Sequence, residues 1–265
     1  MTEFAIPALY ALLVWWLGTG IVLTVVRRRI ETYRASLIVG LSLAIAALVV
    51  IAASSRQDTE LAAYLGFTSA IVVWGFVELT FLTGLVTGPN KNNTAASVSG
   101  FARLRPAVAS VIHHELALLA GGIAILIAAH GAIGATAFLT YSLLWIMRLS
   151  AKINLFLGVP QLHDELLPAP IVHLRSHFRR RPVSSRLAIS ILMTLAAGLA
   201  LVWLAITATP SATATEHALL ASLCLLACLE HVFMLIPVPL MKMWNWGGRR
   251  AQPVNTEISI TRRGI

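Results

Sequence analysis

SLLWIMRLSAKINLFLGVPQLHDELLPAPIVHLRSHF, residues 142–178, is the stretch that decides how this chain is interpreted. The stretch begins with an apolar run that ends in two basic residues, Arg148 and Lys152. A second apolar run follows at 153–159 and ends at Pro160. A polar cluster follows, made of His163, Asp164 and Glu165. A simple membrane hairpin needs no such segment, whereas the chain on either side of it consists of long apolar runs.

Composition places the chain among membrane proteins. Of its 265 residues, 58% are hydrophobic and only 12% are charged, which excludes a soluble domain of this length. A transmembrane helix needs ~20 mostly apolar residues. Stretches that qualify lie at roughly 4–26, 35–53, 62–86, 108–129, 132–150, 187–209 and 217–240. We therefore expect an all-α, polytopic membrane protein with about seven transmembrane helices, forming one domain over 1–265.

The placement of the basic residues behind the formal net charge of +9 indicates how the chain crosses the membrane. Lysine and arginine gather after the first, third, fifth and last apolar runs, and Arg56 alone lies on the other side. Basic residues concentrate on the cytoplasmic side of membrane proteins, which predicts a periplasmic N-terminus and a cytoplasmic C-terminus. The same residues favour contact with anionic lipid headgroups. We expect membrane lipids, and no nucleic acid, as partners.

Acidic side chains recur at one depth inside the predicted spans. At ~1.5 Å per residue, Glu78, Glu115 and Glu230 lie ~14–18 Å from the inner face, near the middle of a ~30 Å core. A central charged side chain costs about 2.5–3.5 kcal/mol on insertion scales. The carboxyl groups are therefore expected either to be protonated or to face one another and nearby histidines. The candidate site is Glu78, His113, His114, Glu115, Glu230 and His231.

The residues alone leave several interpretations of this cluster open. A polar network would pin helix packing, since such groups bond across spans for about 0.6–2 kcal/mol. A neutral histidine would also suit the central metal of a tetrapyrrole. A redox metal site is a further possibility, although the Glu-x-x-His pattern of di-iron bundles is absent. A proton relay would instead predict a transporter, which the lack of an internal repeat disfavours.

The segment 151–186 is expected to be a cytoplasmic loop. His173 and His177 are four residues apart, so one helical face would carry both. We expect a basic amphipathic helix lying on the membrane surface, and a zinc site there would need two more ligands. Arg148 and Lys152 are expected to extend toward the inner interface, as long basic side chains near membrane boundaries do.

Several short motifs in the middle half of the chain are distinctive. They are KINLFLGVP at 152–160, ELLP at 165–168, HL at 173–174, TGP at 87–89 and HEL at 114–116. Together they resemble the PuhE family, integral membrane proteins described as photosynthetic-complex assembly factors. An aromatic residue often precedes the His-Glu pair in that family, where this chain has His113.

The resemblance implies an accessory protein of anoxygenic photosynthesis in the bacterial inner or intracytoplasmic membrane. It would aid assembly of reaction-centre and core-antenna subunits, its expected partners, or the supply of bacteriochlorophyll. A bacteriochlorophyll or a precursor is then the candidate ligand of the Glu/His cluster, with iron or haem as the alternative. The residues expected to dock an assembly partner are Lys152, Asn154, Phe156, Pro160, His163, Asp164 and Glu165. No catalysis is expected; the enzyme alternative is a membrane metalloenzyme that modifies a tetrapyrrole or an isoprenoid.

Overall fold

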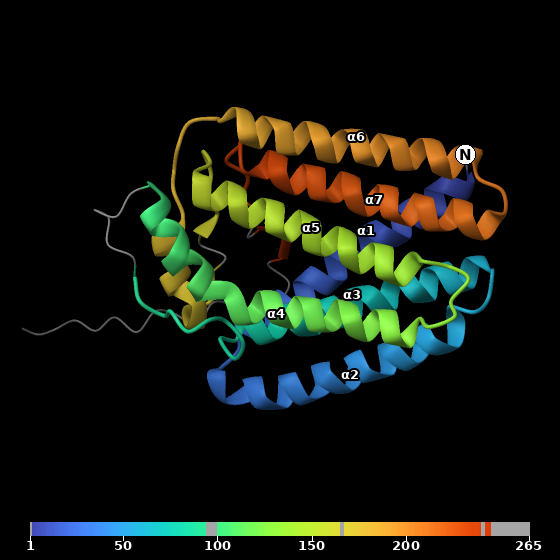
Figure 1. Ribbon diagram of the computed structural model, residues 1–265, viewed down its shortest axis with the longest axis horizontal. Helices are drawn as coiled ribbons and strands as arrows, with labels where there is room; N and C mark the ends of the chain where they lie inside the picture. Colours follow the sequence, from blue (N-terminus) through green and yellow to red (C-terminus); the bar gives the residue numbers. More distant parts are fainter. Residues whose placement is uncertain (1, 94–99, 165–166, 240–241, 245–265) are drawn as a thin grey trace, which may run out of the picture.

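The chain folds into a bundle of long α-helices (Figure 1). The computed structural model describes residues 2–93, 100–164, 167–239 and 242–244. Within these ranges the long helices are α1 (Thr2–Val26), α2 (Tyr33–Ser54), α3 (Glu60–Leu82), α4 (Leu104–Ala128), α5 (Thr136–Leu157), α6 (Ser185–Thr207) and α7 (Ser211–Phe233). The short 3-10 segments are η1 (Ile30–Thr32), η2 (Gly100–Arg103) and η4 (Ala169–His177).

The architecture is that of an all-α, polytopic membrane protein, as the composition predicts. In the described part of the chain, six helices are long and apolar enough to cross a membrane: α1, α2, α3, α4, α6 and α7. The remaining long helix, α5, has 22 residues but carries Arg148, Lys152 and Asn154 in its second half. It nevertheless lies within the bundle alongside the others (Figure 1).

Helices α3 and α7 occupy the centre of the bundle. In each, 56% of the most apolar window is buried, against 17–22% in the other four candidate spans. The outer helices therefore turn large apolar side chains outward, such as Leu192 and Trp203 on α6. Lipid acyl chains accept such a surface, because they are as apolar as the side chains themselves.

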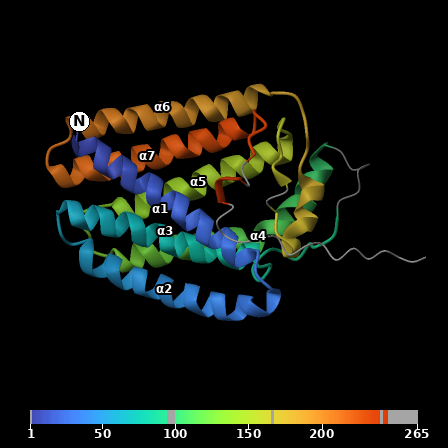
Figure 2. The ribbon, with the colours of Figure 1, turned by 180° about the vertical axis from the view of Figure 1, so that it is seen from behind.

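Two apolar clusters hold the bundle together. The first joins α2, α3, α4 and α5 and contains Ile51, Val73, Leu118, Ile125 and Tyr141. The second joins α1, α3 and α7 around Phe67, with Ala11, Leu219 and Leu223. Figure 2 shows α1 lying across the face formed by its neighbours in the second cluster.

Successive long helices reverse direction, so the N-terminus and the end of α7 lie at opposite ends of the bundle (Figure 1). We call the end at which α1, α3, α5 and α7 terminate the basic end. At the other end the loops contact one another, since the Ile133 N–H donates to the Ser55 carbonyl at 2.8 Å. This alternation is what the predicted topology requires, while which end faces the cytoplasm stays a prediction.

The segment between α5 and α6 begins later than expected. Helix α5 continues to Leu157 instead of ending near residue 150. It stops at Gly158, whose φ of +121° favours glycine. The first residues of the expected loop 151–186 are therefore helical and belong to the bundle.

The 3-10 segment η4 takes the place of the expected amphipathic surface helix. It folds back on the basic end, where Ile171 and Leu174 pack against Phe81 of α3. A 3-10 helix has three residues per turn, so His173 and His177 do not share a face as they would in an α-helix. His177 is accordingly buried, and His173 is half-buried.

Candidate functional site

The loop after α3 packs its backbone into α4 and thereby positions the site. The His114 N–H donates to the Thr87 carbonyl at 2.9 Å, and the Asn90 N–H donates to the Ala109 carbonyl at 3.2 Å. Gly88 lies between these contacts, and a Cβ there would come within 2.1 Å of the Ala109 oxygen. Glycine alone permits so close an approach of two backbones. The motif around Gly88 therefore fixes the position of α4 along its axis relative to the end of α3.

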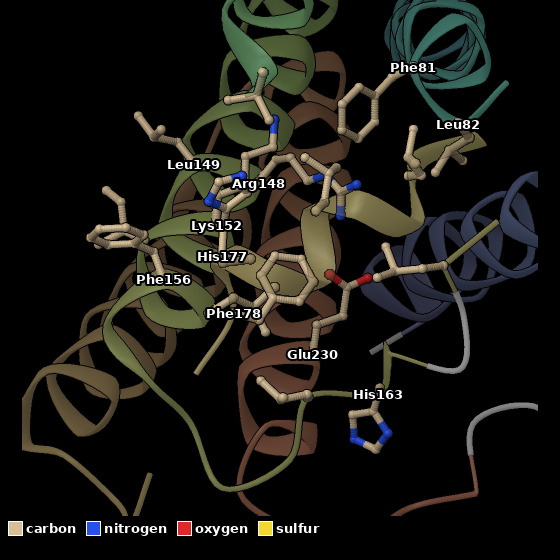
Figure 3. A pocket seen from close by; sticks show the side chains of 18 of the residues that line it. Phe81, Leu82, Arg148, Leu149, Lys152, Phe156, His163, His177, Phe178 and Glu230 are labelled. Carbon is tan, nitrogen blue, oxygen red and sulfur yellow. The ribbon is translucent and has the colours of Figure 1, made fainter. Parts of the chain in front are cut away.

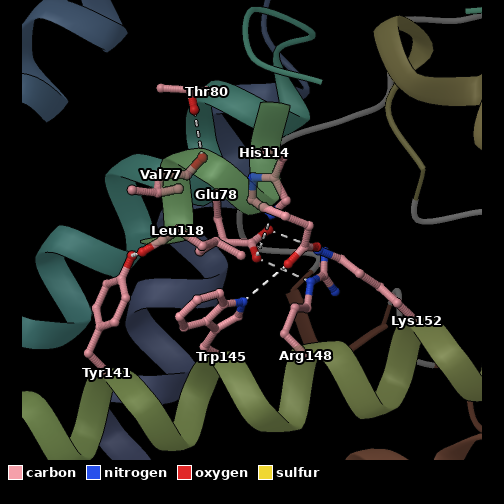
Figure 4. Close-up of polar contacts among 10 residues, drawn as sticks. Val77, Glu78, Thr80, His114, Leu118, Tyr141, Trp145, Arg148 and Lys152 are labelled. Atoms are coloured by element: carbon pink, nitrogen blue, oxygen red, sulfur yellow. Dashed lines mark hydrogen bonds and ion pairs between the residues drawn. The ribbon is translucent and has the colours of Figure 1, made fainter. Parts of the chain in front are cut away.

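Glu78 of α3 is buried and forms a two-point ion pair with α5 (Figure 4). The Nε and Nη2 of Arg148 donate to its two carboxylate oxygens at 3.1 and 3.2 Å. The Nε2 of buried His114 lies 3.6 Å from Glu78 Oε1. The imidazole ring also stacks on Phe81, with 4.2 Å between ring centroids. A two-point arginine–carboxylate pair has a restricted geometry, so it constrains the rotation of α5 relative to α3.

Glu115 of α4 has its own partners on α5. Lys152 Nζ donates to Oε1 at 2.6 Å, and Trp145 Nε1 donates to Oε2 at 3.1 Å. Trp145, Arg148 and Lys152 are spaced i, i+3 and i+7, which places them on one helical face, and Figure 4 shows them projecting together. The expectation that Arg148 and Lys152 extend toward the interface is thus wrong. Both point inward, because buried carboxylates need compensating charge.

Glu230 of α7 differs from the other two carboxylates. It accepts a hydrogen bond from Trp15 Nε1 at 3.1 Å and, within the described residues, forms no ion pair. The residue is exposed, and Figure 3 shows its carboxylate pointing into a cavity. The adjacent His231 is buried and turned toward α5, where its Nε2 lies 2.9 Å from Ser150 Oγ.

The cavity has a volume of about 650 Å³ and lies at the basic end between α1, α4, α5 and α7, with η4 over it. Its charged and histidine lining is Glu115, Arg148, Lys152, His163, His177 and Glu230. Its aromatic lining is Trp15, Phe81, Phe156, Phe178, Phe233 and Trp244. Ligand pockets commonly measure ~300–1,000 Å³, with mostly apolar walls and a few placed polar groups. The arrangement suits an apolar, flat ligand with one polar centre.

Comparison with known proteins places the chain in a family. The family described as "Protein of unknown function (DUF3623)" matches residues 1–255. The chain belongs to the DUF3623 family. A relative from Rhodobacter capsulatus, described as an uncharacterized 30.4 kDa protein in the puhA 5′ region, is 35% identical over 246 residues. The similarity covers 90% of this chain and 89% of that protein. No solved structure matches this DUF3623 chain.

The structure brings together only part of the predicted Glu/His cluster. Glu115 and Glu230 line the cavity of this DUF3623 protein. Glu78 does not line it but binds Arg148, which does. His114 and His231 are buried but are not among the lining residues. His113 is exposed and lies outside the cluster, because neighbours on a helix point ~100° apart.

The first residues expected to dock a partner are used inside the bundle. Lys152 binds Glu115, as described above. Asn154 is buried, and its Nδ2 donates to Ser190 Oγ of α6 at 3.0 Å. Phe156 lines the cavity, with the Arg103 guanidinium 4.7 Å from its ring centroid. These three side chains thus support the site itself.

The remaining docking candidates lie in the segment that covers the cavity. His163 lines the cavity, and its Nε2 donates to the Phe233 carbonyl at 2.8 Å. Asp164 forms an ion pair with Arg175, and Pro160 is half-buried. Glu165 lies outside the described residues. Docking of a protein on this segment stays a prediction.

His177 fastens η4 to the start of α4. Its Nε2 lies 2.9 Å from Ser110 Oγ, and Arg103 donates to its carbonyl at 2.9 Å. Burial is the main cause that lowers the pKa of His177 below its usual value, and the charges of His173 and Arg103 act in the same direction. These causes favour the neutral form of the imidazole that joins η4 to α4.

The described ranges contain no group of three or more His, Cys, Asp or Glu side chains placed to share a metal ion. A protein-bound zinc or di-iron centre therefore has no support in that part of the chain. His173 and His177 are two such donors, but they face different directions in η4. Of the two carboxylates that line the cavity, Glu115 is paired with Lys152, and Glu230 forms no ion pair within the described residues.

Three residues that complete the site were not predicted. Arg148 was expected at the membrane boundary, and no role at the site was assigned to Trp15 or Trp145. The i, i+4 spacing of Arg148 and Lys152 in an apolar helix was an available signal, since it places two charges on one face. For the tryptophans no comparable signal exists in the sequence, because their indole N–H groups bond to helices far away in the chain.

Proposed function

We propose that this protein binds a bacteriochlorophyll or a late precursor in the cavity at the basic end and acts as an accessory factor of photosynthetic-complex assembly. The observation that carries the proposal is Glu230: a carboxylate without a cationic partner among the described residues, facing a largely apolar, aromatic-lined cavity of about 650 Å³. The pigment is bound as cargo, and the protein performs no reaction on it.

The chemistry of the lining fits a magnesium tetrapyrrole. Mg²⁺ prefers oxygen ligands, carboxylates among them, and Glu230 presents a carboxylate oxygen beyond the one that Trp15 engages. Aromatic side chains such as Phe81 and Phe178 supply flat apolar contact area for a macrocycle. The two other carboxylates of the predicted cluster, Glu78 and Glu115, are already neutralised by α5.

Two further findings favour a photosynthesis-related role. The Rhodobacter capsulatus relative lies in the puhA 5′ region. The motif at 152–160 resembles that of the PuhE assembly factors, and in this chain it forms the end of α5 and the wall of the cavity. Four residues of this motif, Lys152, Ile153, Leu155 and Phe156, therefore line the proposed binding site.

Pigment binding by purified protein tests the proposal. Bacteriochlorophyll a is added to the protein in detergent, and absorption and visible circular dichroism are followed. We expect saturable binding with an induced dichroic band, and a Kd about tenfold higher for Glu230→Gln, which corresponds to about 1.4 kcal/mol. His113→Gln is the matched control, since His113 is exposed and lies outside the cavity.

Two results would overturn the proposal: no saturable binding by the wild-type protein, or equal binding by Glu230→Gln. A cellular test follows the same logic. Cells carrying Glu230→Gln should accumulate less photosynthetic complex while the variant protein is still inserted in the membrane.

A further inference from the structure

The walls of the cavity are not equally covered by protein. Most lining residues are buried or half-buried, but four apolar ones are exposed. Two belong to the start of α4, Leu104 (43% exposed) and Val108 (45%), and two to the end of α5, Leu149 (44%) and Ile153 (49%). The cavity therefore has a mouth between α4 and α5, which we define by these four residues.

The mouth lies on the outer surface of the bundle, near its basic end. Val108 is one turn from the start of α4, and Ile153 is one turn from the end of α5. At ~1.5 Å per residue these positions are ~6 Å from the helix ends. Exposed leucine, valine and isoleucine on the outer surface of a membrane protein suit contact with lipid tails.

The charges inside the cavity restrict what passes through this mouth. In the part of the chain that the structure describes, the two cations of the lining, Arg148 and Lys152, each pair with a carboxylate. The Glu230 carboxylate remains in addition. A ligand that brings a free carboxylate would meet a like charge with no spare cation, and like charges in a poorly hydrated site repel strongly. An esterified ligand avoids this cost.

We propose that the cavity takes the esterified, long-tailed form of its ligand directly from the bilayer, through the mouth between α4 and α5. The polar centre of the ligand lies at Glu230, and its hydrocarbon tail stays in the mouth against Val108 and Leu149. The inference rests on the proposed function and adds the chemical class of the cargo and its route.

The test uses full-length protein in phosphatidylcholine nanodiscs and two probes with the same macrocycle. Bacteriochlorophyll a carries the esterified tail, and bacteriochlorophyllide a has the free propionic acid. We expect the wild-type protein to bind the tailed pigment at least tenfold more tightly. Val108→Trp combined with Leu149→Trp should slow loading of the tailed pigment at least tenfold. Ile123→Trp, on the same α4 and equally exposed (48%) but away from the cavity, should load like the wild type.

A second double variant, with alanine at the same two positions, is the control for misfolding of the double tryptophan variant. Val108→Ala combined with Leu149→Ala widens the mouth and should load at least as fast as the wild type. Equal affinity for both probes, or unchanged loading of the double tryptophan variant, would overturn the inference while leaving the proposed function standing. If neither pigment binds the wild-type protein, both proposals fall.

Discussion

Arg148 and Glu78 form a two-point ion pair inside the helical bundle, with 3.1 Å between Nε and Oε1 and 3.2 Å between Nη2 and Oε2. The pair joins the middle of the chain to the end of α3, 70 residues away. Separating two such charges in a poorly hydrated interior leaves an uncompensated ion on each side. The pair therefore fixes the orientation of α5, which carries Arg148 and Lys152, relative to α3.

Removal of one partner of this pair should destabilise the protein strongly. For Glu78→Gln we expect a loss of about 1–3 kcal/mol, because the Arg148 guanidinium is left unpaired at a site where its side chain is 38% exposed. The double variant Glu78→Gln with Arg148→Gln should lose less than the sum of the single losses, by about 1–3 kcal/mol. Thermal unfolding in detergent measures this, with Arg186→Gln as an exposed control. Strict additivity of the two single variants would contradict the pairing.

The neighbours His113 and His114 should respond in opposite ways to alanine. His114 is buried and stacked on Phe81, so His114→Ala leaves a cavity and should cost about 2–4 kcal/mol. His113 is exposed, and His113→Ala should change stability by less than about 0.5 kcal/mol. Denaturation of the two purified variants under identical conditions checks this contrast. Similar losses in both would mean that α4 is rotated from the orientation described.

Gly88 and Gly75 form a second matched pair. A Cβ at Gly88 would meet backbone atoms of α4 at 2.1–2.9 Å, so Gly88→Ala should cost about 3 kcal/mol or more, because backbone cannot move aside as a side chain does. Gly75 lies inside α3 with no atom within 4 Å of its would-be Cβ, and Gly75→Ala should stabilise by about 0.5–1 kcal/mol. The yield of folded, monodisperse protein and its melting temperature distinguish the two. A neutral Gly88→Ala would refute the close contact of the two backbones.

Stability should fall in mild acid because of His177. Burial lowers the pKa of His177 in the folded protein, whereas the unfolded chain has an ordinary histidine pKa of about 6.5. Below about pH 6.5 the unfolded state therefore binds more protons, and the free energy of unfolding decreases until the lower folded-state pKa is reached.

His177→Gln keeps a polar side chain near Ser110 without a titrating group. Its melting temperature should consequently depend less on pH between 7.5 and 5.5 than that of the wild type. His173, whose pKa is also lowered by burial, accounts for part of the remaining slope. An unchanged pH dependence in His177→Gln would show that the imidazole does not hold η4 in neutral form.

Much of the fold was predictable from residue order alone. The apolar runs at 35–53 and 187–209 fall within two residues of α2 and α6 at both ends, since the length of a span is imposed by the thickness of the bilayer. The common depth of Glu78, Glu115 and Glu230 stays a prediction, since Glu78 and Glu230 lie four and three residues before the ends of α3 and α7, whereas Glu115 lies eleven residues after the start of α4.

The partners of those carboxylates were not predictable in the same way. Which side chain faces which depends on the rotation of each helix and on its neighbours, and both follow from packing between segments far apart in the chain. The sequence therefore determined a polytopic helical protein with acidic groups in three of its helices. Only the tertiary structure decided that α5 neutralises two of them and leaves Glu230 facing a cavity, because burying an ion requires a partner at hydrogen-bonding distance and that distance exists only after the helices pack.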